Sequence, residues 1–196
     1  MPVLATRKGK RMINNISEQS DEPGLEAAST LAQVKCITLY QPFASLVALG
    51  AKKTETRSWR THYRGRLLIH AARAFPRWAR DLCNREPFAR VLREAGYADL
   101  VSGSIDPDRL PLGEILAVCN LKHCVRIGTP GIDLPLAEPD RSFGDYTNGR
   151  YAWILTDVQP LSPTISAIGS MGLWKPDELV LGSKQLLLHP SLEEEH

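Results

Sequence analysis

The sequence of 196 residues has few cysteines, and they do not form the series of paired ligands that is typical of a zinc site. Its four cysteines include no C-x-x-C pair. Cys119 and Cys124 are an odd number of residues apart, so on one regular strand they would point to opposite faces, and His123 beside them would not complete a site. We therefore expect buried free thiols, no metal site and no cofactor.

Long apolar runs are also missing. No run near the N-terminus has the length of a signal sequence, and none approaches the about 20 apolar residues that cross a membrane. Together with the unpaired cysteines, these absences predict a cytoplasmic protein with no membrane partner. With 43% hydrophobic and 23% charged residues, the chain has the composition of a globular protein that buries one core.

Acidic residues are almost absent between Gly50 and Arg80. This segment holds nine basic residues and the single acid Glu55, whereas the net charge of the whole chain is only +2. Positive charge concentrated in one segment of a near-neutral chain is typical of a protein that binds a polyanion. A solvated basic face has the same composition, and charge alone does not separate these two interpretations.

Apolar periodicity predicts one ordered domain between two tails. Residues 1–33 have no sustained periodicity and are predicted to be a flexible N-terminal tail, while residues 176–196 are predicted to be a C-terminal extension. The ordered domain is predicted over residues 35–175.

Within that domain, strands are predicted to outnumber helices. The strand predictions cover residues 36–40, 54–58, 66–72, 113–125 and 151–158, and the helix predictions cover 42–49, 78–83 and 88–95. The last long strand is expected to end at Pro160, with closing segments at 165–168 and 172–174. Unequal strands with few helices favour an α+β fold, a small mixed β-barrel with peripheral helices.

One motif follows the first predicted helix directly. Residues Gly50 to Arg57 read G-x-K-x-x-E-x-R. Here the chain resembles the activating-signal-cointegrator homology (ASCH) domain, a family of PUA-like barrels associated with RNA. The resemblance covers roughly residues 35–175 in the right order, through the blocks Leu39–Leu46, Arg57–Trp59, Tyr63–Gly65, Leu68–His70, Leu112–Ile115, Phe143–Tyr146, Gly149–Trp153 and Gly172–Trp174.

The chemistry of the motif residues fits an anionic ligand. Glu55 and Arg57 are two apart in a predicted strand and share a face, so the carboxylate can hold Lys52 and Arg57 while Arg57 keeps donors for a phosphate or a base edge. Aromatic residues nearby would stack on unpaired bases. The predicted ligand site consists of Gln41, Lys52, Lys53, Glu55, Arg57, Trp59, Tyr63, Arg64, Glu114 and Trp174.

Structural interpretations of the same residues stay open. Lys52, Glu55 and Arg57 would form an internal ion-pair cluster in one of them. Trp153 lies in an apolar strand and is expected to be a core residue, and His70 is expected to be a buried histidine with its hydrogen bonds satisfied.

Three hypotheses about function differ in class. The first is a domain that binds RNA or a nucleotide in a basic and aromatic cleft. The second is a hydrolase, because one group of the resembling family is similar to an amidohydrolase of acetylated cytidine. That group has a Thr nucleophile where this chain has Glu55, so Lys52 and Glu55 become the candidate catalytic pair of a ribonuclease-like or nucleoside-directed reaction. The third is a protein-interaction domain, which no other sequence feature supports.

Overall fold

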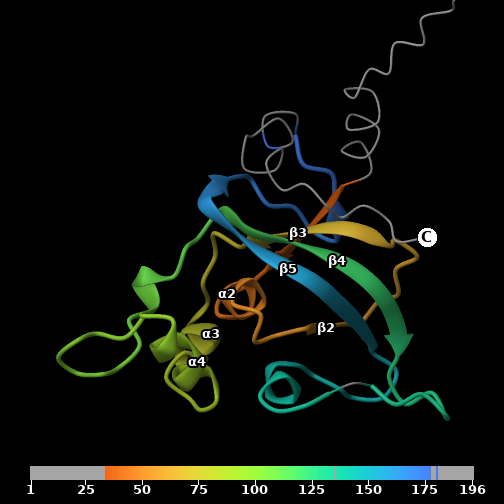
Figure 1. Ribbon diagram of the computed structural model, residues 1–196, viewed down its shortest axis with the longest axis horizontal. Coiled ribbons are helices and arrows are strands. Elements are labelled where there is room, and N and C mark those ends of the chain that lie inside the picture. The colour runs from red at the N-terminus through yellow and green to blue at the C-terminus, as the bar shows by residue number, and fades with distance from the viewer. Residues whose placement is uncertain (1–33, 135, 178–179, 181–196) are drawn as a thin grey trace, which may run out of the picture.

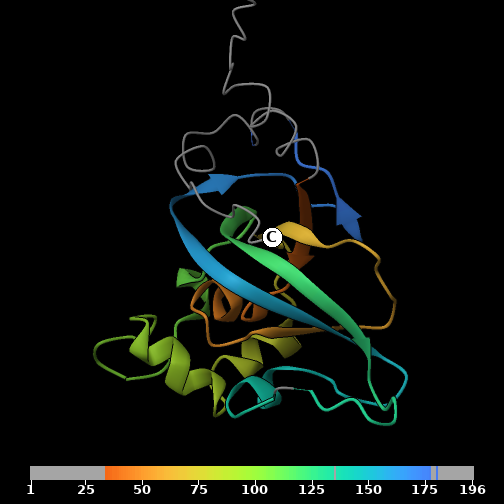
Figure 2. The ribbon, with the colours of Figure 1, turned by 45° about the vertical axis from the view of Figure 1, so that its right-hand side comes forward.

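The computed structural model describes residues 34–134, 136–177 and 180 of the chain. Six strands form one mixed sheet in the order β2-β5-β4-β3-β1-β6, and the sheet curls into a half-barrel over helix α2 (Figures 1 and 2). The predicted α+β class with a barrel-like sheet is confirmed. The elements are β1 (Lys35–Leu39), α2 (Phe43–Ala48), β2 (Thr54–Arg57), β3 (Gly65–Ala71), α3 (Arg77–Leu82), α4 (Phe88–Glu94), η1 (Pro107–Arg109), β4 (Glu114–Arg126), η2 (Asp140–Phe143), β5 (Tyr151–Ser166) and β6 (Leu173–Trp174).

The predicted N-terminal tail and most of the C-terminal extension lie outside the described residues, so the domain boundaries stay predictions. Within the described part of the chain, no helix has both the length and the apolar character needed to cross a membrane.

Strand β3 lies in the middle of the sheet and is buried on both faces. It pairs in parallel with β1 and antiparallel with β4. Leu67 and Ile69 contribute to one core cluster and Leu68 to another, which explains why this strand reads as a continuous apolar run without alternation. We call these the inner cluster and the outer cluster.

Helix α2 fills the concave side of the sheet. Ala44 and Val47 belong to the inner cluster, and the helix packs against β1, β3, β4 and β5. Gly50 adopts a positive φ of 72°, a conformation that glycine reaches without strain. The chain then turns back, and the backbone N–H of Lys52 donates to the carbonyl of Leu46. This turn connects α2 to β2 and contains the first residues of the motif.

Strand β5 is longer than the sequence predicts, because it does not end at Pro160 but continues to Ser166. Its pairing with β4 shifts register at three places, and Asp157 has a φ of 53° at one of them. Bulges bend a strand and admit a residue without a backbone N–H, so the ladder continues past the proline. Ile165, predicted to begin a separate closing segment, is paired with β4.

The same bulges correct the prediction for the cysteines. A register shift between Leu121 and His123 resets the alternation of β4, so Cys119 and Cys124 both contact the inner cluster instead of pointing to opposite faces. Cys36, Cys83 and Cys119 are buried free thiols, and Cys124 is half-buried. Burial raises the pKa of Cys83 to about 11 and that of Cys119 to about 12.

Helices α3 and α4 form a small lobe beside the open end of the half-barrel (Figure 1). The lobe has a core cluster of its own. Phe88 of α4 packs against Leu46 of α2 and Phe143 of η2, so the lobe and the loop around η2 both contact the helix inside the half-barrel. This packing places the lobe next to β2.

Candidate functional site

The half-barrel has a seam between its two ends. Strand β2 is one edge of the sheet, and β1 lies next to the other edge. The side chain of Arg57 bridges the seam, because its Nη2 donates to the carbonyl of Thr38 on β1 at 3.1 Å, while its Nε lies 3.1 Å from Oε1 of Glu55 on β2.

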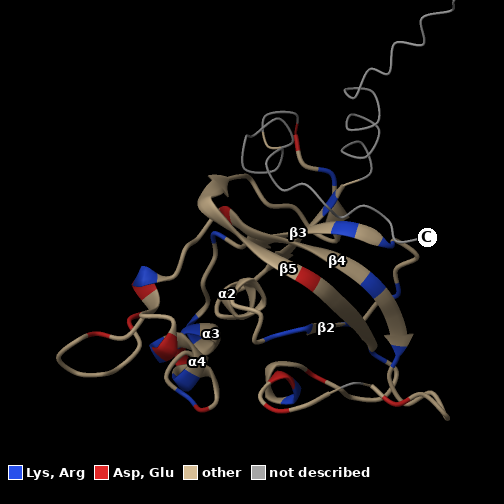
Figure 3. Cartoon of the chain, viewed as in Figure 1, with Lys and Arg blue, Asp and Glu red and all other residues tan. Residues whose placement is uncertain are grey.

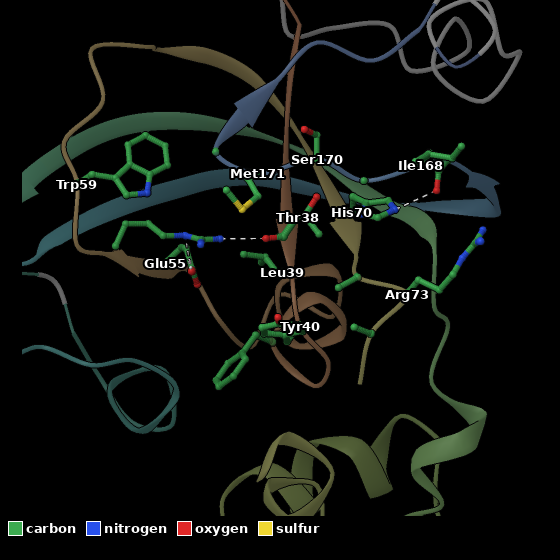
Figure 4. Close-up of a pocket in the computed structure, with 17 residues that line it drawn as sticks. Thr38, Leu39, Tyr40, Glu55, Trp59, His70, Arg73, Ile168, Ser170 and Met171 are labelled. Atoms are coloured by element: carbon green, nitrogen blue, oxygen red, sulfur yellow. Dashed lines mark hydrogen bonds and ion pairs between the residues drawn. The ribbon is translucent and has the colours of Figure 1, made fainter. Parts of the chain in front are cut away.

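A cavity of about 750 Å³ opens along this seam (Figure 4). We call it the seam cavity. Its walls come from β1, β2, the end of β3 and the loop Ala167–Gly172, which we call the closing loop. A cavity of this size is typical of sites for small molecules. Its lining includes Thr38, Leu39, Tyr40, Phe43, Glu55, Arg57, Trp59, His70, Arg73, Ser170 and Met171.

Lys52 lies beneath this cavity and is only 1% exposed. Its Nζ donates to the carbonyls of Thr54 at 2.6 Å and Phe143 at 2.7 Å, and lies 3.3 Å from Oε2 of Glu55. An ammonium group has three hydrogens, and these three contacts occupy them. Glu55 is thereby held between two cations, Lys52 at one carboxylate oxygen and Arg57 at the other.

Asp140 of η2 supports this arrangement from outside the motif. Its Oδ1 accepts hydrogen bonds from the backbone N–H groups of Lys53 at 3.1 Å and Thr54 at 3.3 Å. Burial raises the pKa of Asp140, and the nearby Lys52 charge and these hydrogen bonds oppose that shift. Asp140 was not predicted, because no local pattern links it to Lys53, which precedes it by 87 positions.

His70 lies at the opposite end of the cavity and is 1% exposed. Its Nε2 lies 3.2 Å from the carbonyl of Ala167, but Nδ1 has no hydrogen-bond partner in the described part of the chain. The expectation that this histidine is fully satisfied is therefore wrong for one ring nitrogen. Burial lowers the pKa of His70, and the charge of Arg73 acts in the same direction. A Cβ on Gly169 would come within 2.5 Å of the ring, so the closing loop packs tightly on it.

Trp59 and Tyr40 give the cavity aromatic surfaces. Trp59 is half-buried and packs edge-on against Trp153 at 4.7 Å, and Trp153 is the fully buried core residue that the sequence predicts. Tyr40 is 45% exposed, and Met171 of the closing loop is 94% exposed. Because these side chains are open to solvent, a ligand can reach them.

The structure brings Glu55, Arg57 and Trp59 together in the seam cavity, with Lys52 beneath them. It adds residues that were not predicted, among them Thr38, Tyr40, Arg73, Ser170 and Met171. The one local signal for the closing loop is its composition: two glycines and small residues just before Leu173. Glycine allows close approach of the backbone.

Other predicted site residues have contacts elsewhere. Gln41 is buried, donates to the carbonyl of Pro111 and accepts from the backbone N–H of Ser45. Glu114 accepts a hydrogen bond from the Thr164 hydroxyl at 2.6 Å. None of these residues lines the seam cavity.

Trp174 lies behind the cavity, edge-on to His70, and its indole N–H donates to Thr38 Oγ1 at 3.0 Å. Tyr63 donates to the carbonyl of Arg66, and Arg64 to those of Thr61 and Tyr63. Lys53 is exposed to solvent.

The basic segment does not form one continuous face. Figure 3 shows its basic residues spread over β2, β3 and α3, and α3 also contains the acidic residue Asp81. Lys52 is buried and Arg66 half-buried, so they contribute less to the surface charge than exposed residues such as Arg73 and Arg77.

The fold and the site together define an α+β half-barrel domain with a ligand-sized cavity where the barrel stays open. The ASCH domain family matches residues 37–164, and this chain belongs to that family. The resemblance found in the sequence is thus confirmed.

Two curated relatives are the activating signal cointegrator 1 proteins of Mus musculus and Homo sapiens. The mouse protein is 26% identical over 157 residues and the human protein 25% identical over 154 residues, in each case across 78% of this chain. The chain spans about a quarter of the length of these relatives, 24% of each.

Among solved structures, the chain is similar to the crystal structure of ASCH from Zymomonas mobilis. The identity is 17% and the TM-score 0.42, over 75% of this chain and 90% of that chain. A mutant of the same protein also gives 17% identity and a TM-score of 0.42, over 74% of this chain and 91% of that chain.

Proposed function

We propose that this ASCH domain binds a nucleotide, free or as an unpaired residue of RNA, in the seam cavity. The observation that carries the proposal is the position of Arg57, whose guanidinium lies in a ligand-sized cavity between aromatic side chains. Guanidinium groups recognise phosphates and base edges, and aromatic side chains stack on bases.

The two ends of the cavity differ in chemistry, which suggests an orientation for the ligand. Trp59 lies at one end, with Glu55 near it, and Arg73 lies at the other end (Figure 4). Arg57 contacts Glu55. A base would lie between Trp59 and the exposed Met171, within reach of Arg57 and Glu55. The phosphate would then lie toward Arg73, which is exposed and keeps its charge accessible to an anion.

Glu55 does not make the cavity repel an anion, because Lys52 and Arg57 both contact its carboxylate. The three side chains together carry one net positive charge. In this arrangement Lys52 acts on the ligand only through Glu55, and Glu55 fixes the orientation of Arg57. A guanidinium held in advance loses less conformational freedom when the ligand binds.

The hydrolase alternative has less support. A catalytic lysine must reach the substrate, whereas Lys52 is 1% exposed and its Nζ contacts two carbonyls and Glu55. These contacts of Lys52 stabilise the motif, and the proposed binding does not require Lys52 to contact the ligand.

A titration of the full chain with mononucleotides and a single-stranded RNA pentamer tests the proposal. We expect Arg73→Ala to weaken binding about 10-fold or more, because hydrogen bonds to charged groups contribute about 1.5–3 kcal/mol. Trp59→Ala should also weaken it. The matched control is Lys122→Ala, an exposed cation on β4 outside the cavity, which should change affinity little.

Affinity for the pentamer should also fall as salt rises, because phosphates that contact arginine release counterions. If the wild-type chain binds neither mononucleotides nor RNA at low salt, the proposal is wrong. If Arg73→Ala and Lys122→Ala lowered the affinity equally, binding would depend on the overall surface charge and not on the cavity.

A further inference from the structure

A second cavity of about 430 Å³ adjoins the seam cavity, and both are lined by Phe43 and Glu55. We call it the lobe cavity, because Trp78, Leu82 and Phe88 of the helical lobe form one of its sides. Most of the remaining wall comes from η2, the loop after it and the residue before β5, through Phe143, Gly144, Asp145 and Arg150.

An aromatic surface runs from one cavity to the other. Trp78 is 52% exposed, and its ring lies 5.9 Å from that of Tyr40, edge to face, and 6.4 Å from that of Phe43. Tyr40 lines the seam cavity, Trp78 lines the lobe cavity and Phe43 lines both. A tryptophan that leaves half of its surface in water, beside another exposed aromatic ring, is typical of a surface that binds a partner.

The electrostatics of the shared wall favour an anion that crosses it. Glu55, the acid common to both cavities, is held by Lys52 and Arg57. The lobe cavity also has an arginine of its own, Arg150, whose Nε lies 3.3 Å from Asp145 and whose side chain is 30% exposed. An apolar peptide would gain little from these cations, whereas a phosphodiester between two stacked bases would interact with them.

We propose that the lobe cavity is a second base subsite, with Trp78 as its stacking residue. The ligand of this domain is then a single-stranded RNA segment of at least two nucleotides, not a free mononucleotide. This inference rests on the proposed function of the seam cavity and specifies the class of ligand. One base occupies the seam cavity, the next stacks on Trp78, and the phosphate between them passes over Phe43 and the cluster of Lys52, Glu55 and Arg57.

The test compares the affinities of the full chain for AMP, ADP and the 5′-phosphorylated dinucleotide pApA, here abbreviated ApA, by calorimetry. We expect ApA to bind about 5-fold to 150-fold more tightly than AMP, the range that stacking of one more base gives. ADP adds charge without a second base and should show a smaller gain. Trp78→Ala should abolish the preference for ApA and leave AMP affinity unchanged, and Trp78→Phe should keep most of it.

Leu100→Ala is the matched control, because Leu100 is a fully exposed apolar residue in the segment after α4 and lines neither cavity. Equal affinities for AMP and ApA, an equal gain with ADP, or a preference for ApA that survives in Trp78→Ala would each overturn the second subsite while the proposed function stands. If AMP, ApA and RNA all fail to bind, the proposed function itself fails, and the subsite with it.

Discussion

At the scale of single residues, the buried position of Lys52 gives it a different role from the one that the motif predicts. The sequence places it beside the ligand, at the start of an extended segment. In the structure, the turn at Gly50 directs the chain back under the helix, and the backbone N–H of Lys52 donates to Leu46. The side chain then points into the protein, where it contacts two carbonyls and Glu55.

Removal of this buried cation should destabilise the fold. Lys52→Ala leaves Glu55 with one cation and two carbonyls without their donor, and breaking a buried ion pair costs about 3–5 kcal/mol. Lys53→Ala, next to it but exposed, should change the free energy of unfolding by less than about 0.5 kcal/mol. Urea denaturation of both variants measures the difference. A Lys52→Ala variant as stable as the Lys53→Ala variant would show that the ion pair does not contribute to folding.

At the scale of elements, the closing loop depends on strand β3 for its position. Ala167 offers its carbonyl to His70 Nε2, and Gly169 lies against the same ring. The contact joins the end of β3 to the segment that forms one wall of the seam cavity. The loop has no regular structure of its own, and this contact holds its first residue together with the hydrogen bond from the Ala167 N–H to the carbonyl of Gly113.

Acid should destabilise the fold through His70, because protonation places a charge on a buried ring; the hydrogen bond to Ala167 opposes this effect and Arg73 adds to it. Burial lowers its pKa in the folded state below the usual value of about 6.5. Between the folded and the unfolded pKa, the unfolded chain binds more protons, so the stabilisation from neutral His70 is complete above pH about 6.5 and is lost as the pH falls below it. His70→Gln keeps a donor for Ala167 and does not titrate.

The free energy of unfolding of the wild type should therefore fall more steeply from pH 7.5 to 5 than that of His70→Gln. Denaturation at several pH values measures the two slopes, and other titrating groups affect both proteins equally. Parallel curves would mean that His70 does not contribute to the acid sensitivity.

The strands were predictable to different degrees. Strands β1 and β3 follow from their apolar residues, because burial on both faces leaves a continuous run. The end of β5 was not predictable, since the bulges that carry it past Pro160 depend on its pairing with β4. A bulge is a property of two strands, and neither sequence encodes it alone.

At the scale of the whole molecule, the outer cluster joins the two ends of the described chain. Val34 and Val180 are 2% and 4% exposed and pack in the same cluster as Leu68 of β3. The predicted domain boundary at residue 175 leaves Val180 out. The outer face of the sheet is therefore covered in part by a residue beyond β6.

Truncation tests this contact. A fragment of residues 34–181 should unfold cooperatively with nearly the stability of the full chain, whereas a fragment of residues 34–175 should lose about 1.5–3 kcal/mol, the contribution of burying one valine-sized side chain. Thermal melts compare the two, with residues 34–196 as the control. Equal stability of the 34–175 and 34–181 fragments would show that Val180 is not part of the folding unit.

The sequence by itself determined the family, through ordered blocks along the chain, and the class of fold, through the apolar periodicity of its segments. It also determined that Glu55 and Arg57 lie together, because they are two residues apart in one strand. Only the tertiary structure decided where the site lies. The seam brings β1, β2 and the closing loop together, and the helical lobe places Trp78 beside Tyr40. The curvature of a sheet and the packing of a lobe arise from contacts between distant segments, and no local pattern contains them.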